Sequence, residues 1–324
     1  MRVDPELVER FRADLAPLWP SIDDEAFRLG IALSGGGDSL ALLLLAHSAL
    51  PGRVEAATVD HGLRPESAAE AQTAADYCHE LGVPHVTLQV NVEPGNMQDR
   101  ARAARYEALG QWCDERELDA LATAHQADDQ AETFLMRLNR GSGIEGLSAV
   151  RALGTIPGKS IALVRSLLGW RREELAKIVA RAGWTPVVDP SNENQAFDRI
   201  RMRRHLADND WLDVAAIGQS VRHLAEAAET LRWAIDREQA ERVTFDGQSA
   251  TYRAGRGGTL LQGGVIRAIF RHFGVQIDQG TAATLVEALS SKKKVNVAGM
   301  QAEVSQADGE ELWLFRPENP RRTG

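Results

Sequence analysis

A glycine-rich segment carries the clearest chemical pattern in this chain of 324 residues. It reads Ser34-Gly35-Gly36-Gly37-Asp38-Ser39 and stands between the apolar stretches 31–33 and 40–45. Consecutive glycines permit positive φ angles and a close approach of the main chain to a ligand. A helix that begins directly after them presents free N–H groups and the positive end of its dipole, and both attract anions. The segment therefore predicts a phosphate or pyrophosphate site with contacts from Ser34, Ser39 and the loop amides.

Two other phosphate motifs fit this segment less well. The ATPase P-loop requires a lysine after its glycines, and no lysine follows these. The dinucleotide motif G-x-G-x-x-G loses its last glycine to Leu40, although Asp60 ends the next apolar stretch, where a ribose-binding acid would stand. A dinucleotide site and a plain glycine turn stay open as alternatives.

A second polar cluster follows a later apolar stretch and contains His125, Asp128, Asp129 and Glu132. Helical spacing places both aspartates near Glu132. Three carboxylates on one face repel one another unless a cation joins them. The cluster predicts a pocket for Mg²⁺ or for a cationic amine. Acidic N-capping of a helix and metal ligation that includes His125 are the alternatives.

Arginines gather beside these acidic groups. Arg102 and Arg105 share one helical face upstream, and further arginines follow at Arg137, Arg140, Arg199, Arg201, Arg203 and Arg204. A guanidinium can bind a carboxylate or phosphate through two parallel hydrogen bonds, whereas exposed helix faces are the alternative. Residues 137–204 hold 13 Lys+Arg against 6 Asp+Glu, although the whole chain has a net charge of -9. This asymmetry predicts a face that binds a polyanion.

Alternating strands and helices must position these residues. Apolar stretches predict strands at Leu29–Leu33, Val54–Val59, Val86–Val90 and Ala120–Ala124. Helices are predicted at Asp38–Ala49, Ala68–Leu81, Asp99–Glu115 and from Asp128 to just before Gly141. The order indicates an α/β fold with a parallel sheet and right-handed crossovers. Such sheets bind ligands at the carboxyl ends of their strands, where the glycine segment, Asp60-His61 and His125 all stand.

The second half predicts two further parts. Apolar residues recur in steps of three and four from Val214 to Ile235, which predicts one long helix that packs on a neighbour. Formation of a homodimer through this stripe is the alternative. A small α+β module follows, with helices at 265–273 and 281–289, strands at 295–298, 301–306 and 311–315, and a hairpin turn at 307–310. The predicted domains are residues 1–208, a helical linker 209–242, and 243–324.

Composition bounds the class of protein. The two cysteines, Cys78 and Cys113, have no metal or redox spacing, so a disulfide scaffold is excluded as an explanation of the fold. The first residues lack the pattern of a signal peptide, and no apolar run reaches the length of a membrane span. We expect a cytoplasmic enzyme.

A family resemblance joins these motifs. Ser-Gly-Gly-x-Asp-Ser after a strand resembles the PP-loop signature of the ATP pyrophosphatases, which cleave ATP to AMP and pyrophosphate. The ordered set resembles the tRNA(Ile)-lysidine synthetase family from roughly Ala32 to Leu206, through the glycine segment, Val59–Arg64, Arg102–Tyr106, His125–Glu132, Leu138–Leu147 and Asp189–Arg204. One departure is Ile200, where the family usually has asparagine.

The resemblance implies a parallel-sheet PP-loop domain, adenine nucleotide alpha hydrolase-like, that joins lysine to the wobble cytidine of the CAU anticodon in tRNA(Ile) through an adenylated cytidine. It implies catalytic roles for Asp38, His125 and Asp129, with positioning and proton removal both open for His125. It implies ATP contacts from Ser34–Ser39, Asp60 and His61, and Mg²⁺ at Asp38 and Asp128. It implies lysine contacts from Arg105, Asp129 and Glu132, and tRNA contacts from Arg137, Arg140, Arg199, Arg201, Arg203, Arg204 and the C-terminal module.

Two other functions remain as alternatives. The first is a PP-loop tRNA 2-thiolation enzyme, although the paired Cys-x-x-Cys motifs of one branch are absent from this sequence. The second is a nucleotide-binding module without catalysis, for which clustered carboxylates and arginines at strand ends have no evident use.

Overall fold

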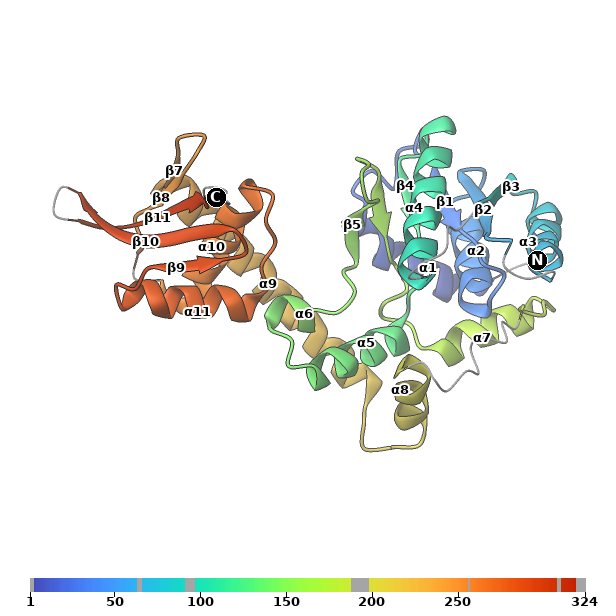
Figure 1. The fold of residues 1–324 in the computed structure, drawn as a ribbon. Coiled ribbons are helices and arrows are strands. Elements are labelled where there is room, and N and C mark those ends of the chain that lie inside the picture. Colours follow the sequence, from blue (N-terminus) through green and yellow to red (C-terminus); the bar gives the residue numbers. More distant parts are fainter. Residues whose placement is uncertain are drawn as a thin grey trace. The chain divides into compact units, whose positions relative to one another are not determined.

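The computed structural model describes residues 3–62, 66–90, 97–187, 198–255, 257–307 and 310–318. The chain divides into two units, one formed by Met1–Ser142 and Gly146–His223 and the other by Gly143–Glu145 and Leu224–Gly324 (Figure 1).

The described residues of the first unit contain a six-stranded sheet in the order β3-β2-β1-β4-β6-β5. Its strands are β1 (Leu29–Ala32), β2 (Val54–Asp60), β3 (His85–Gln89), β4 (Ala120–Ala122), β5 (Leu153–Thr155) and β6 (Ala162–Val164). The pairs are parallel except for β5 with β6. Because β2 and β3 lie on one side of β1 and β4 lies on the other, the strand order reverses between β1 and β4. Open parallel sheets bind ligands outside the strand ends at such a reversal.

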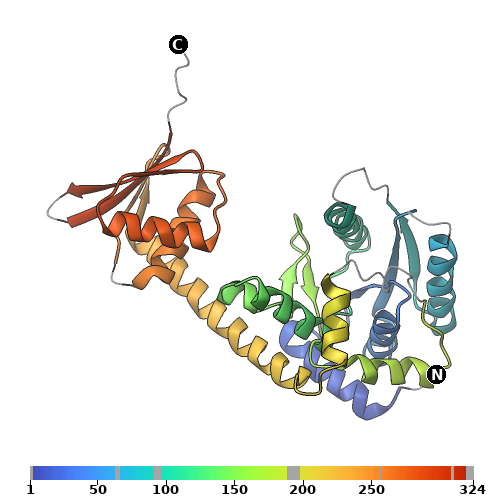
Figure 2. The same cartoon turned by 60° about the horizontal axis from the view of Figure 1, so that its bottom comes forward.

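Helices cover both faces of this sheet (Figure 2). Leu29 and Ile31 of β1 belong to a core with the helices α1 (Pro5–Leu15), α2 (Gly37–Ala49), α3 (Ser67–Leu81) and α7 (Arg172–Arg181). Ala32 belongs to a second core with α4 (Met97–Glu115) on the opposite face. Strands buried on both faces read as nearly continuous apolar runs rather than as alternating ones. The predicted α/β class with a parallel sheet is thereby confirmed.

The predicted strands agree with β1 to β4 to within two residues at each end. The prediction contains neither the short strands β5 and β6 nor the helix α7. The first unit also contains the 3-10 turn η1 (Ala16–Leu18), α5 (Ala127–Asn139) and α8 (Asp198–Ala207). The short helix α6 (Ile144–Leu147) begins in the segment Gly143–Glu145 of the second unit and ends in the first unit.

The apolar stripe after residue 214 forms one helix, α9 (Val214–Arg242), as predicted. Its N-terminal residue Val214 packs with Ala127 and Ala131 of α5 in the first unit. Near its other end, Ile235 packs on the core of the second unit. The stripe is therefore used for packing within the chain, and the homodimer alternative stays a prediction.

The second unit is a small α+β module. Its antiparallel sheet has the order β7-β8-β11-β10-β9 in the described residues, and α10 and α11 contribute to the same apolar core. The elements are β7 (Val243–Phe245), β8 (Ala250–Tyr252), α10 (Gly258–His272), α11 (Gln279–Ser290), β9 (Val295–Val297), β10 (Met300–Ala307) and β11 (Glu310–Pro317). Positions 308 and 309 of the predicted hairpin turn lie outside the described residues. Across the described chain, every helix is too short or too polar to span a membrane.

Candidate active site

The glycine segment forms the turn from β1 into α2. Gly35 has a φ of 78°, and a Cβ atom there would lie 3.1 Å from Cγ2 of Val187, so both the conformation and the space favour glycine. The Ser34 N–H donates to Oγ of Ser39 at 3.2 Å, and the Ser39 hydroxyl donates to the carbonyl of Gly36 at 2.9 Å. No described side chain caps the first amides of α2. These amides therefore remain available to an anion, as the sequence predicts.

Two cavities meet at this turn. The smaller, of about 460 Å³, lies between the ends of β1 and β2 and the start of α3. The larger, of about 690 Å³, extends from the same turn across the end of β4 to α7 and α8. Ser34 and Arg105 line both cavities. The two cavities therefore lie at the ends of β1 and β4, where the strand order of the sheet reverses.

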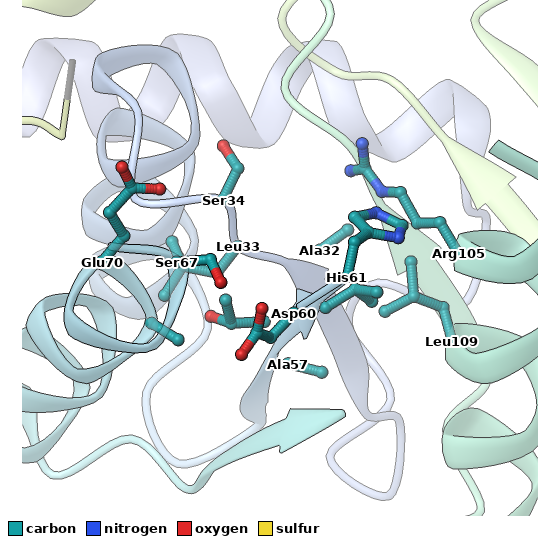
Figure 3. A pocket seen from close by; sticks show the side chains of 13 residues that line it. Ala32, Leu33, Ser34, Ala57, Asp60, His61, Ser67, Glu70, Arg105 and Leu109 are labelled. Atoms are coloured by element: carbon teal, nitrogen blue, oxygen red, sulfur yellow. The ribbon is translucent and has the colours of Figure 1, made fainter. Parts of the chain in front are cut away.

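Asp60 and His61 line the smaller cavity (Figure 3). Asp60 accepts hydrogen bonds from the Gly62 N–H at 2.9 Å and from the Gln89 amide at 3.0 Å, and the bond from Gly62 is the main reason why its pKa is lowered. Burial lowers the pKa of His61, and Arg105 adds to this effect. No described residue pairs with the buried Nδ1 of His61. The cavity thus offers a fixed anion and an unsatisfied imidazole nitrogen.

Asp38 faces the larger cavity from the first turn of α2. Burial raises its pKa to about 6, against the opposing effect of Arg172, whose Nε lies 4.0 Å away. The neighbouring Asp129 raises it further. An ionised Asp38 is therefore only partly compensated by the protein, so a bound cation would stabilise it.

Glu132 is the centre of a cluster of charges between α5, α7 and α8. Its side chain is 0% exposed, and it accepts hydrogen bonds from Nε of Arg199 at 2.9 Å, Nε of Arg203 at 2.9 Å and Nη2 of Arg172 at 3.2 Å. Burial by itself would raise the pKa of Glu132, but the hydrogen bonds from Arg203 and Arg199 lower it overall. Three arginines of the chain thus supply the positive charge that the clustered carboxylates were expected to need.

Asp129 belongs to the same cluster and also lines the larger cavity. Nη2 of Arg199 donates to it at 3.1 Å, and Arg172 approaches to 3.5 Å. Its other oxygen accepts the Gln126 N–H at 3.3 Å and completes a capping box at the start of α5. Burial outweighs these interactions and raises the pKa of Asp129. Both alternatives for this residue, helix capping and a pocket for a cation, are therefore compatible with its position.

Asp128 lines neither of the two cavities. Its carboxylate accepts hydrogen bonds from Arg171 at 3.2 and 3.3 Å and from the Arg172 N–H at 2.9 Å. These contacts anchor the start of α7 and give both oxygens protein partners. A metal role for Asp128 stays a prediction, but its carboxylate lacks the access that Asp38 has.

His125 lines the larger cavity beyond the end of β4. Burial, followed by the nearby Arg165 and Arg105, lowers its pKa to about 3. Nδ1 lies 3.0 Å from the hydroxyl of Thr123. An imidazole with so low a pKa is neutral at physiological pH and is a weak base, which favours positioning over proton removal.

The structure brings together most, but not all, of the predicted site residues. Lining the larger cavity are Ser34, Gly36, Gly37, Asp38, Ser39, Arg105, His125, Asp129, Arg199 and Arg203. Arg137 lies elsewhere, because its guanidinium donates to the carbonyls of Gly146 and Ala149. Arg140, Arg201 and Arg204 are exposed. The motif residues 63–65 and 188–197 lie outside the described residues.

Sequence reasoning missed Arg172. This arginine lines the larger cavity and contacts three acidic residues, yet it stands in no motif and looks like one of several basic residues at the start of an amphipathic helix. Only the folded structure brings it to Asp38 and Glu132, which precede it by 134 and 40 positions.

The parallel sheet and its glycine turn at the strand reversal define a PP-loop domain, a type of ATP-using domain. A family model described as "PP-loop domain" matches residues 7–210. A tRNA(Ile)-lysidine synthase from Zymomonas mobilis is 41% identical over 302 residues, which cover 91% of this chain and 90% of that protein. One from Novosphingobium aromaticivorans is 47% identical over 230 residues, covering 70% and 69%. The chain belongs to the tRNA(Ile)-lysidine synthase family.

A solved structure shares the fold at low sequence identity. The U34-tRNA thiolase NcsA from Methanococcus maripaludis superposes with a TM-score of 0.57 at 18% identity, covering 68% of this chain and 78% of that one. The likeness supports the PP-loop fold and nothing finer.

Proposed function

We propose that this protein is a ligase that converts the wobble cytidine of tRNA(Ile) with the CAU anticodon into lysidine, using ATP and free lysine. In the first step the 2-carbonyl oxygen of cytosine attacks the α-phosphorus of ATP, and pyrophosphate leaves. In the second step the neutral ε-amine of lysine attacks carbon 2, the bond from carbon 2 to the bridging oxygen breaks so that AMP leaves with this oxygen, and the amine nitrogen loses a proton to solvent. The observation that carries the proposal is one cavity that joins an anion-binding turn to a carboxylate–arginine cluster.

In this proposal the glycine turn binds the phosphates of ATP and the smaller cavity binds its adenosine. The free amides of α2 suit the phosphate chain, because they supply hydrogen-bond donors to oxyanions. The hydroxyls of Ser34 and Ser39 lie beside them and would have to turn from their present partners to donate to a phosphate. The smaller cavity, with Asp60 and His61, suits the adenosine.

Asp38 fits a role in holding Mg²⁺. Its partly compensated carboxylate opens into the cavity, and the described residues contain no cluster of three or more metal-ligating side chains. Mg²⁺ typically uses one or two carboxylates together with phosphate oxygens and water, so a single aspartate beside the phosphate chain suffices. When bound, the ion would neutralise charge on the phosphate oxygens.

Asp129 and Arg105 fit the free lysine. Asp129 offers a carboxylate to an amine, and Arg105 offers a guanidinium to the lysine carboxylate, both within the larger cavity. Glu132 has no exposed surface, so we propose that it acts by holding the arginines rather than by direct contact with lysine. An amine that approaches Asp129 has to compete with Arg199 for the same oxygen.

The arginines of α8 and the second unit fit the tRNA. Arg201 and Arg204 are exposed on the same helix as the two arginines held by Glu132, and phosphate contacts by such residues give salt-dependent affinity. A tRNA-binding role for residues 243–324 and a cytoplasmic location belong to the same proposal.

The test is mass analysis of nucleosides from tRNA(Ile) incubated with the protein, Mg-ATP and lysine. Lysidine is expected together with AMP and pyrophosphate, and no lysidine is expected when lysine is omitted. Asp38→Ala should abolish the product, whereas the exposed Asp208→Asn on the surface should retain it. Formation of ADP, or an untouched nucleotide with all reactants present, would refute the proposal.

Buried thiols disfavour the 2-thiolation alternative. The chain has two cysteines, Cys78 and Cys113, and both are buried. Burial raises the pKa of each thiol to about 12, so neither forms the reactive thiolate at neutral pH. A sulfur carrier on this chain would require an accessible cysteine.

A further inference from the structure

Arg172 lies in the larger cavity between the anion-binding turn and the carboxylate–arginine cluster. It is the first residue of α7, and it lines the cavity together with Gly36, Gly37 and Asp38 of the anion-binding turn. Its Nε lies 4.0 Å from the Asp38 carboxylate. A phosphate chain held at the turn would therefore lie beside this guanidinium.

Buried acidic residues hold Arg172 at one end. Its Nη2 donates to Glu132 at 3.2 Å and lies 3.5 Å from Asp129, while 31% of its side chain remains exposed. Glu132 is itself fully buried and is also hydrogen-bonded by Arg199 and Arg203. A cation fixed in this way needs little reorganisation when negative charge develops next to it, which is the arrangement that electrostatic catalysis requires.

Neutralising the two carboxylates does not require Arg172. Arg199 and Arg203 of α8 already donate to Glu132 at 2.9 Å each, and Arg199 also donates to Asp129 at 3.1 Å. Two arginines thus balance Glu132 and Asp129, and the third positive charge, on Arg172, is left to face Asp38 and the cavity. If Asp38 binds a cation, as in the proposed function, Arg172 can pair with an anionic ligand instead.

We propose, on the basis of the proposed function, that Arg172 is a further catalytic residue of the first step and that Glu132 positions it. In that step a bond forms between the cytosine 2-oxygen and the α-phosphorus of ATP. The bond from the α-phosphorus to the bridging oxygen breaks, and its electron pair leaves with pyrophosphate. The guanidinium hydrogen-bonds the phosphate oxygens and stabilises the charge that moves onto the leaving group.

The test isolates the first step by omitting lysine. With tRNA(Ile) and Mg-ATP, Arg172→Gln should slow single-turnover release of pyrophosphate by about 100- to 1,000-fold, the range for loss of one charge-stabilising donor. Its affinity for tRNA(Ile), measured by filter binding, should change little. Arg172→Lys should recover part of the rate, and added guanidinium should raise the rate of Arg172→Ala. Arg181→Gln, which removes one exposed arginine from the last turn of the same helix, is the matched control and should keep the wild-type rate.

The outcomes separate the two proposals. If the wild-type protein releases no pyrophosphate, the proposed function fails. If it does, and Arg172→Gln releases pyrophosphate at the wild-type rate, the role of Arg172 is refuted, even when the variant needs more lysine for the complete reaction. Should Arg172→Gln lose its fold by circular dichroism, the decision rests on Arg172→Lys and on rescue by guanidinium, and failure of both to restore pyrophosphate release refutes the role.

Discussion

Asp38 should destabilise the folded protein at neutral pH, and its removal should show this. The carboxyl has a pKa of about 6 in the folded protein against 3.8 in the unfolded chain, mainly because it is buried. Since the folded state binds this proton more tightly, the protein should lose stability as the pH rises from about 4 to about 6. Asparagine occupies nearly the same volume and does not ionise, so Asp38→Asn should remove that cost.

The magnitude follows from the two pKa values. The ionised carboxyl lowers the free energy of unfolding by about 3 kcal/mol at pH 7.5 and by about 1 kcal/mol at pH 4.5. Asp38→Asn should therefore be more stable than wild type, and its advantage should grow by about 2 kcal/mol between these two pH values.

Urea unfolding without nucleotide or Mg²⁺ measures this difference. Hydrogen exchange of peptides from β1 and α2 would follow the first unit alone. The exposed Asp208→Asn is the control and should change stability by less than about 0.5 kcal/mol at either pH. An advantage of Asp38→Asn that is absent, or that shrinks as the pH rises, would refute the reasoning. The same variant should form no lysidine, so the position would sacrifice stability for function.

Three further outcomes follow from the site. Gly35→Ala should reduce pyrophosphate release at least about tenfold, because its positive φ is strained for alanine and its Cβ would press on Val187; an unchanged rate would contradict the geometry. Glu132→Ala should lower the free energy of unfolding by about 2–4 kcal/mol in urea, since it leaves three arginines without their shared partner, whereas the exposed Glu173→Ala should be nearly neutral. His125 should show no titration between pH 5.5 and 8 by NMR, in keeping with its pKa of about 3, and a midpoint near 6.5 would contradict its burial among arginines.

The sequence predicts the sheet and the glycine turn well because both depend on local patterns. Strands buried on two faces form nearly continuous apolar runs, and a turn with positive φ at Gly35 favours glycine. The prediction contains neither β5 nor β6, because their antiparallel pairing departs from the alternation of strands and helices that indicates the parallel sheet.

The acidic cluster shows where a linear pattern stops. The sequence places Asp128 and Asp129 in one acidic group because they are neighbours and both lie near Glu132. Neighbouring side chains on a helix point about 100° apart, however, and only Asp129 lines the cavity. The partners of Glu132 are 40, 67 and 71 positions away, and no periodicity connects them. The excess of positive charge in residues 137–204 is visible in the sequence. That Asp129 and Glu132 of α5 neutralise part of this charge is visible only in the structure.

The two buried thiols have a practical consequence. Because Cys78 and Cys113 stay protonated and covered in the fold, maleimide dyes should react with them slowly. A single cysteine introduced on the surface could therefore be labelled in the otherwise natural chain. A fluorophore placed beside α8 would then test the proposed contact between the arginines of this helix and tRNA.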